Sequence, residues 1–161
     1  MKNFLLIVFL SIICQFSFSQ CQVKTTTKQN GNVLKYLNPK PVVRQADYEI
    51  GVSVYKNISS NSTMLNVSVL FKGKEVKELE GDAIIHTSGE RGISLKPVVF
   101  DLVEMNGKDV AIGLYYIEPI LLSYFENNYR KNIFVKVGGD LIGTSVSENK
   151  WIIRDNLNCL N

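Results

Sequence analysis

Apolar and polar residues alternate most regularly between Tyr48 and Phe71. The segment 48–54 places an apolar side chain at every second position, and the segment 65–71 repeats the pattern. A period of two puts each apolar set on one face of a strand. The intervening segment 56–63 contains turn-forming residues and no helical period. This stretch therefore predicts a long-looped antiparallel hairpin around which the rest of the chain is organised.

Further apolar runs flank short turn-forming segments. Asn-Gly and Gly-Gly pairs suit tight turns because these residues tolerate positive φ. The pattern predicts hairpins over 22–37, 83–96, 98–117 and 132–146. In the last of these, Val135 is expected to face Ile142. The charged segment 75–79 is expected to form an edge strand.

The hairpin 98–117 carries apolar residues on both of its predicted faces. One face is expected to hold Phe100, Leu102, Ile112 and Leu114, and the other Val99, Val103, Ala111 and Tyr115. Strands that are apolar on both faces are typically covered on both sides. We therefore expect both strands of this hairpin to be central in their sheet.

Two segments have helical features. Pro119 fits the first turn of a helix, and Ile120 is spaced four residues from Tyr124, which predicts a short helix over 119–127. Ser147 is expected to cap a second helix near 148–158, with Glu148 in its first turn. Since hairpins outnumber helices, the predicted fold is mainly β. It is an antiparallel, hairpin-rich β-sandwich or partly open barrel.

The N-terminus has the features of a signal peptide. Lys2 precedes an apolar run over 4–16, and small residues at Ser17 and Ser19 predict cleavage before Gln20. The run is short for a membrane span, and no second one follows it. We therefore expect a signal peptide over 1–19, no transmembrane segment in the mature chain, and a single β-rich domain over 20–161.

The end of this segment carries a resemblance. The sequence Ser17-Phe18-Ser19-Gln20 resembles the signal peptides of small exported proteins from Bacteroidetes-type bacteria. The resemblance implies a periplasmic or secreted location, and it implies no activity.

Two of the three cysteines remain after such cleavage, because Cys14 lies within the signal peptide. Cys21 and Cys159 are then an even pair near the two ends of an exported domain, which predicts a disulfide. Two unpaired thiols are the first alternative. A lipid anchor at Cys21 is the second, but Gln20 and Phe18 stand where lipoproteins usually have a small residue and a leucine.

Charge and candidate catalytic residues exclude several classes of protein. The 18 basic and 15 acidic residues give +3, and loss of Lys2 leaves 17 against 15, or +2. The basic residues are scattered, so nucleic-acid binding is not expected. His86 is the only histidine and lacks a recognisable triad motif, and the acidic alternation 78–82 is read as a solvated edge. We therefore expect neither an enzyme, nor a metal site, nor a cofactor.

Aromatic residues are the feature that points to binding. Tyr115, Tyr124, Tyr129 and Trp151 are candidates for an exposed platform, whereas Tyr116 and Phe125 are expected in the core. The sequence thus favours an exported, non-catalytic β-rich domain with a binding or structural role. A carbohydrate- or peptide-binding module that uses exposed aromatic residues is the alternative, and a hydrolase that uses His86 is the third hypothesis.

Overall fold

The computed structural model describes residues 21–28, 31–73, 75–89, 91–105 and 107–161, and the predicted signal peptide lies outside them. The strands of the described chain are β1 (Lys24–Thr27), β2 (Val33–Tyr36), β3 (Lys40–Arg44), β4 (Tyr48–Asn57), β5 (Ser62–Phe71), β6 (Leu79–Thr87), β7 (Gly92–Leu95), β8 (Pro97–Met105), β9 (Lys108–Ile117), β10 (Arg130–Val137) and β11 (Asp140–Ser145). The helices are α2 (Pro119–Asn127) and α3 (Ile152–Leu160).

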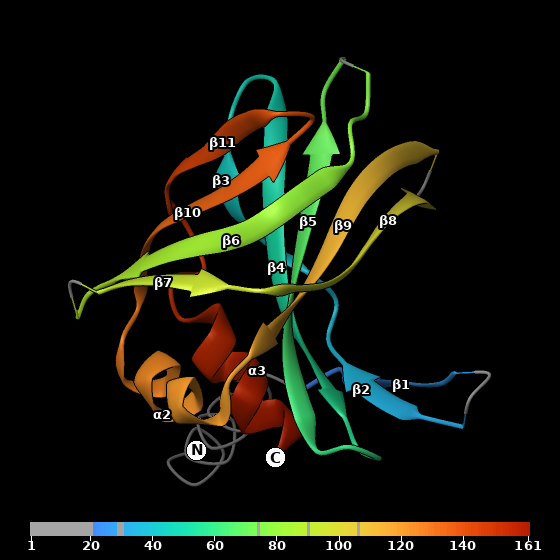
Figure 1. Ribbon diagram of the computed structural model, residues 1–161, viewed down its shortest axis with the longest axis vertical. Helices are drawn as coiled ribbons and strands as arrows, with labels where there is room; N and C mark the ends of the chain where they lie inside the picture. Colours follow the sequence, from blue (N-terminus) through green and yellow to red (C-terminus); the bar gives the residue numbers. More distant parts are fainter. Residues whose placement is uncertain (1–20, 29–30, 74, 90, 106) are drawn as a thin grey trace, which may run out of the picture.

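The strands form two antiparallel sheets (Figure 1). The large sheet has the order β1-β2-β4-β5-β9-β8, with β3 also paired to β4, and it curves into a half-barrel. The small sheet has the order β11-β10-β6-β7. The two helices lie together at one end of the sheets (Figure 1). The predicted mainly-β fold with two helices is confirmed.

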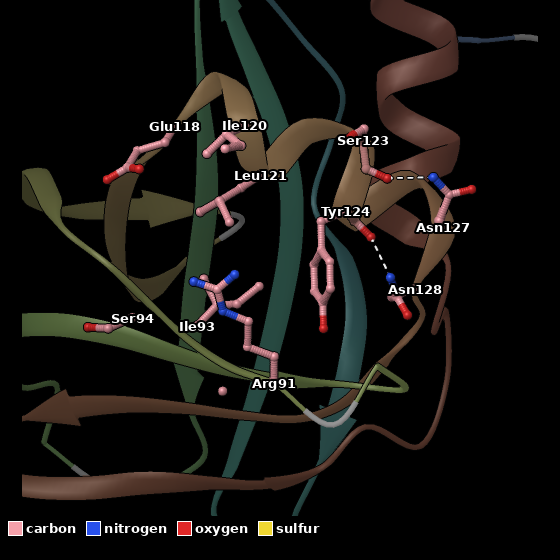
Figure 2. Close-up of a pocket in the computed structure, with 11 residues that line it drawn as sticks. Arg91, Ile93, Ser94, Glu118, Ile120, Leu121, Ser123, Tyr124, Asn127 and Asn128 are labelled. Carbon is pink, nitrogen blue, oxygen red and sulfur yellow. Dashed lines mark hydrogen bonds between the residues drawn. The ribbon is translucent and has the colours of Figure 1, made fainter.

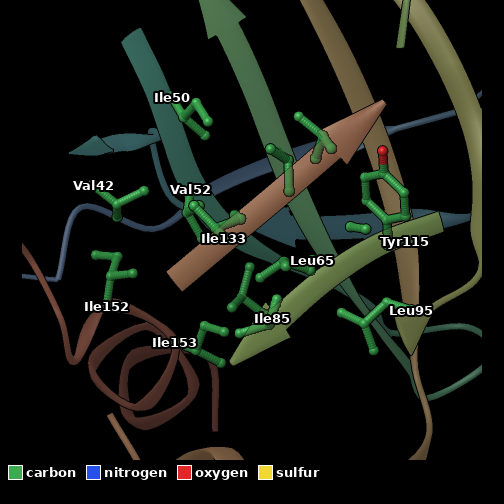
Figure 3. Close-up of a cluster of buried hydrophobic side chains, with 14 of the residues drawn as sticks. Val42, Ile50, Val52, Leu65, Ile85, Leu95, Tyr115, Ile133, Ile152 and Ile153 are labelled. Atoms are coloured by element: carbon green, nitrogen blue, oxygen red, sulfur yellow. The ribbon is translucent and has the colours of Figure 1, made fainter. Parts of the chain in front are cut away.

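The core lies between the sheets and is centred on the β4–β5 hairpin. Ile50 lies opposite Val69 and Val52 opposite Val67, and all four side chains are at most 2% exposed. Ile85 and Ile133 face them from the small sheet, and Ile153 closes the helical end (Figure 3). Full burial of each such side chain contributes about 1.5–3 kcal/mol. The organising hairpin is confirmed, with a shorter loop than predicted because its strands run to Asn57 and from Ser62.

Two short strands share one edge of β4. β2 pairs with residues 55–57 of β4, and β3 pairs with residues 49–52. Neither strand reaches Val54, whose N–H donates to the side-chain oxygen of Asn156 on α3 at 2.9 Å. The Asn156 side chain is buried, so it satisfies a backbone donor that would otherwise lack a partner.

Asn156→Ala is expected to lower the free energy of unfolding by about 1–3 kcal/mol, because it leaves the buried Val54 N–H unpaired. Urea denaturation followed by circular dichroism measures the change. Asn158→Ala is the matched control, since Asn158 lies on the same helix and is exposed. Equal midpoints for the two variants would show that the Asn156 bond does not stabilise the fold.

Both predicted helices are present, but the second begins later in the chain than predicted. The helix over 119–127 is confirmed. The C-terminal helix begins at Ile152, because Asn149 has a φ of 49° and interrupts any helix that starts at Ser147. The predicted Ser147 cap is therefore wrong. Its hydroxyl donates instead to the carbonyl of Val42 at 3.4 Å, which ties this segment to β3.

Two strand predictions need correction. The segment 75–78 has no regular structure, and β6 begins only at Leu79. β3 has no counterpart among the predicted strands, because Pro39 and Pro41 are unfavourable residues for a strand. Pro41 is tolerated because β3 lies at a sheet edge, and the register shifts beside it. The other hairpins are confirmed, including the pairing of Val135 with Ile142.

The hairpin β8–β9 differs from its prediction in two ways. Met105 lies opposite Lys108 across the turn, so even-numbered residues of β8 share a face with odd-numbered residues of β9. Phe100 and Leu102 therefore share the face of Ala111 and Tyr115, not that of Ile112 and Leu114. Only β9 is central, because β8 is the last strand of the large sheet. The exposed apolar residues of β8 are Val98, Val99, Leu102 and Met105, at 42–55%.

The two ends of the described chain are joined covalently. Cys21 and Cys159 form a disulfide with Cα atoms 5.5 Å apart, which confirms the predicted pairing. The bond holds α3 to the segment that precedes β1. The Cys21 sulfur cannot form this disulfide and also the thioether bond of a lipid anchor, so this structure favours the disulfide over a lipid anchor at Cys21.

Candidate functional site: a cleft between β7 and α2

A cleft of about 550 Å³ lies between strand β7 and helix α2 (Figure 2). The β7 wall includes Ile93 and Ser94, and the α2 wall includes Leu121 and Tyr124. Pockets that bind small molecules in proteins have volumes of roughly 300–1,000 Å³. The volume of the cleft therefore falls within the range of small-molecule binding sites.

The two walls run in opposite directions. Near the start of β7, a Cβ at Gly89 would lie 2.5 Å from the hydroxyl of Tyr124, close to the C-terminal end of α2. Near its end, the carbonyl of Lys96 accepts from the N–H of Tyr116, shortly before α2 begins. Figure 2 shows the same arrangement, with Ser94 on the side of Glu118 and the backbone of Arg91 on the side of Tyr124.

A set of hydrogen bonds fixes the wall near the C-terminal end of α2. The Tyr124 hydroxyl lies 2.8 Å from the Thr87 hydroxyl on β6. The Asn128 side-chain amide donates to the carbonyl of Tyr124 at 3.0 Å, and its oxygen accepts from the hydroxyl of Ser88 at 3.4 Å. These bonds join α2 to the β6–β7 hairpin, so the cleft has a defined shape before any ligand enters.

The side chains that line the cleft and are exposed to solvent include two charged ones and a large apolar one. Arg91 and Glu118 are exposed, and neither forms an ion pair with any residue in the described ranges. Ile120 is 78% exposed, the highest value among the large apolar residues of the described chain. The cleft thus combines two opposite charges with an exposed apolar surface.

The structure does not bring the four aromatic candidates together. Tyr115 is 0% exposed and packs against Phe100 in the core, so its assignment to an exposed platform is wrong. Burial, with a smaller contribution from Asp82, raises the pKa of the Tyr115 phenol well above its usual range. Tyr124 lines the cleft.

Tyr129 and Trp151 form a separate pair. Their rings pack edge to face with centroids 5.7 Å apart, and neither residue lines the cleft. The Arg154 guanidinium lies 4.1 Å from the Trp151 ring centre, and the Lys150 ammonium lies 5.9 Å from that of Tyr129. The cations cover faces that a sugar platform would need, so this pair is explained by local packing.

The two aromatic residues assigned to the core have different outcomes. Phe125 is 0% exposed, which confirms its predicted place in the core. Tyr116 is 39% exposed, so its prediction is wrong. The alternation in β9 explains the difference, because Tyr115 and Ile117 take the inward face and leave Tyr116 on the outward one.

His86 lies on the outward face of the small sheet. Its ring packs edge to face against Phe134 with centroids 5.7 Å apart, and a Cβ at Gly92 would lie 3.2 Å from its Nε2 atom. His86 is not among the residues that line the cleft.

The acidic alternation has structural partners. Asp82 accepts hydrogen bonds from Lys96 and Ser94, each at 2.6 Å, and these bonds, that of Lys96 foremost, lower the pKa of its carboxyl group. Glu80 accepts from the N–H of Gly139. Within the part of the chain that the structure describes, no three His, Cys, Asp or Glu side chains are grouped as metal ligands.

Among the residues that line the cleft, the sequence predicts a binding role for Tyr124 alone. Arg91, Ser94, Glu118 and Asn128 belong to no motif, and they come together only because β7 ends the small sheet beside α2. One feature of the sequence does point to the cleft. Pro119, Ile120 and Leu121 are consecutive apolar residues, and a helix as short as 119–127 cannot bury all three.

Comparisons with family models, curated proteins and solved structures gave no match for this chain. Among the described residues, the helices are too short and too polar to cross a bilayer.

Proposed function

We propose that this chain is an exported, non-catalytic binding domain and that the cleft between β7 and α2 is its ligand site. The observation that carries the proposal is the combination of Ile120, Arg91 and Glu118 around one preformed cleft. An apolar surface with a small number of placed polar groups is the usual composition of a ligand site. The Cys21–Cys159 disulfide supports export, because such bonds persist in oxidising compartments. Periplasmic and secreted locations both meet this condition.

Two ligand classes are compatible with the cleft. The Tyr124 ring and the side-chain amides of Asn127 and Asn128 suit a glycan, since sugars stack on aromatic rings and bind amides. The backbone of β7 and the apolar side chains of α2 suit an extended peptide. The hydrolase hypothesis receives no such support, because His86 does not line this cleft.

Ile120→Glu is expected to abolish ligand selection without unfolding the domain. The labelled mature domain would be used to screen a phage-displayed random decapeptide library and a glycan array. Loss of the Ile120 contact is expected to weaken binding about tenfold or more, since burial of an isoleucine contributes about 1.5–3 kcal/mol. Leu141→Glu is the matched control, because Leu141 is also exposed (61%) but lies on β11, outside the cleft.

The wild-type domain and Leu141→Glu should enrich the same ligands, and Ile120→Glu should enrich none of them. If the ligands selected by the wild type bound Ile120→Glu equally well, the cleft would not be the site. If neither library yielded a ligand for the wild type, the binding function itself would be contradicted.

A further inference from the structure

β7 is an edge strand whose unpaired side faces the cleft. Residues 92–95 pair with β6 on one side, and the backbone bonds of the described chain include none from these residues to another element. In an antiparallel pair, alternate residues direct their N–H and C=O groups away from the partner strand. Two residues of β7 therefore offer a donor and an acceptor each to a chain lying in the cleft.

Helix α2 supplies the second wall that such a chain needs. It lies across the cleft from β7 and carries Leu121 and Tyr124 toward it, with Ile120 beside them (Figure 2). Successive side chains of an extended peptide point to opposite faces. A strand placed beside β7 would thus direct every second side chain toward the apolar residues of α2 and the others toward solvent.

The side chains of Arg91 and Glu118, which have no ion-pair partner among the described residues, leave the backbone at opposite ends of the cleft (Figure 2). The Arg91 guanidinium extends toward Ile93 and Leu121 (Figure 2). Arg91 immediately precedes β7 and Glu118 immediately precedes α2, and the two elements run in opposite directions. Four residues of strand span about 13 Å, so a short extended peptide reaches from one charge to the other. An acidic group is favoured beside Arg91 and a basic group beside Glu118.

We infer that the cleft binds an extended peptide by strand addition, as a fifth strand beside β7. The peptide places apolar side chains at alternate positions against α2, an acidic group at the Arg91 end and a basic group at the Glu118 end. This inference rests on the proposed function and names its ligand. A peptide is favoured over a glycan because it repeats N–H and C=O groups at the spacing of β7, which is what an unpaired strand edge complements.

Two hexapeptides of opposite sequence order test the inference. They are acetyl-Lys-Thr-Val-Thr-Val-Glu-amide and acetyl-Glu-Val-Thr-Val-Thr-Lys-amide, titrated against the mature domain with its disulfide intact. One order should bind more tightly, because the ends of the cleft differ in charge. Each backbone nitrogen of the tighter peptide is then methylated in turn. Methylation should weaken binding about 3–10-fold at alternate positions and little at the positions between, which serve as the matched controls.

Charge reversal provides the second readout. Arg91→Glu should weaken the preferred peptide about two- to fivefold, as expected for an exposed ion pair. The double variant Arg91→Glu with Glu118→Lys should reverse the preference between the two sequence orders. Neither substitution lies in the core, so the fold is retained.

The outcomes separate this inference from the function it rests on. Binding without the two-residue period, or selection of glycans alone, would overturn strand addition and leave the binding function standing. If neither hexapeptide bound but peptides from the random library did, the selected peptides would be methylated at each backbone nitrogen in turn. Weaker binding at alternate positions would support strand addition, and its absence would overturn it. Absence of any ligand from both libraries would overturn the inference and the binding function together.

Discussion

Replacing Cys159 with serine is expected to lower the free energy of unfolding by about 4–5 kcal/mol under oxidising conditions. The disulfide closes a loop across a sequence separation of 138 residues, so it removes a large share of the conformational freedom of the unfolded chain. For a domain of this size, each kcal/mol shifts the melting temperature by about 2–4 °C. The melting temperature should therefore fall by roughly 8–20 °C.

The redox state provides the control for this prediction. Under reducing conditions the wild type and Cys159→Ser should melt at the same temperature, because neither then carries the bond. Thermal denaturation with and without reductant measures both effects. An unchanged melting temperature of the wild type on reduction would show that the bond does not form or does not stabilise the fold. Cys21→Ser should match Cys159→Ser, since either change removes the same bond.

Arg130→Met is expected to raise the free energy of unfolding by about 1–4 kcal/mol, the range found when buried ion pairs are replaced by apolar residues. Arg130 is 3% exposed at the start of β10, and no described residue accepts a hydrogen bond from its guanidinium nitrogens. Burial lowers the pKa of Arg130 to about 9, with Asp155 opposing the shift, so the group remains charged at pH 7. The folded protein therefore bears the cost of a desolvated charge.

A methionine at this position keeps most of the side-chain length and adapts to irregular space. Urea denaturation at pH 7 measures the gain in stability. Arg91→Met is the matched control and should change the midpoint little, because Arg91 is exposed and forms no ion pair with the described residues. A lower midpoint for Arg130→Met would contradict the prediction and show that the guanidinium has a stabilising partner in solution.

The parts of the fold that were predicted correctly depend on local signals. The alternation in 48–54 and 65–71 and the Gly138-Gly139 turn each define a hairpin and its register within a few residues. The faces of β8 and β9 were assigned wrongly because they depend on which residues lie opposite across the turn at Gly107. A change of one position in that register moves every side chain to the other face.

The cleft could not be predicted for a different reason. Residues 96–118 separate its two walls in the sequence, and the walls meet because β7 is the last strand of the small sheet and α2 packs at the end of the sheets (Figure 1). Strand order within a sheet is a property of the whole chain, and no local pattern encodes it. Tyr115 shows the same limit, since its burial depends on which face of β9 meets the core.

The central claim is that ligands bind between β7 and α2, and amide chemical-shift mapping tests it most directly. The ¹⁵N-labelled chain over residues 20–161, with its disulfide intact, would be titrated with the tighter hexapeptide or with a ligand selected from either library. The account predicts that the largest shifts occur at the amides of 91–95 and of α2, with β8 and β11 unchanged. Largest shifts on the exposed edge of β8, or around Tyr129 and Trp151, would contradict it.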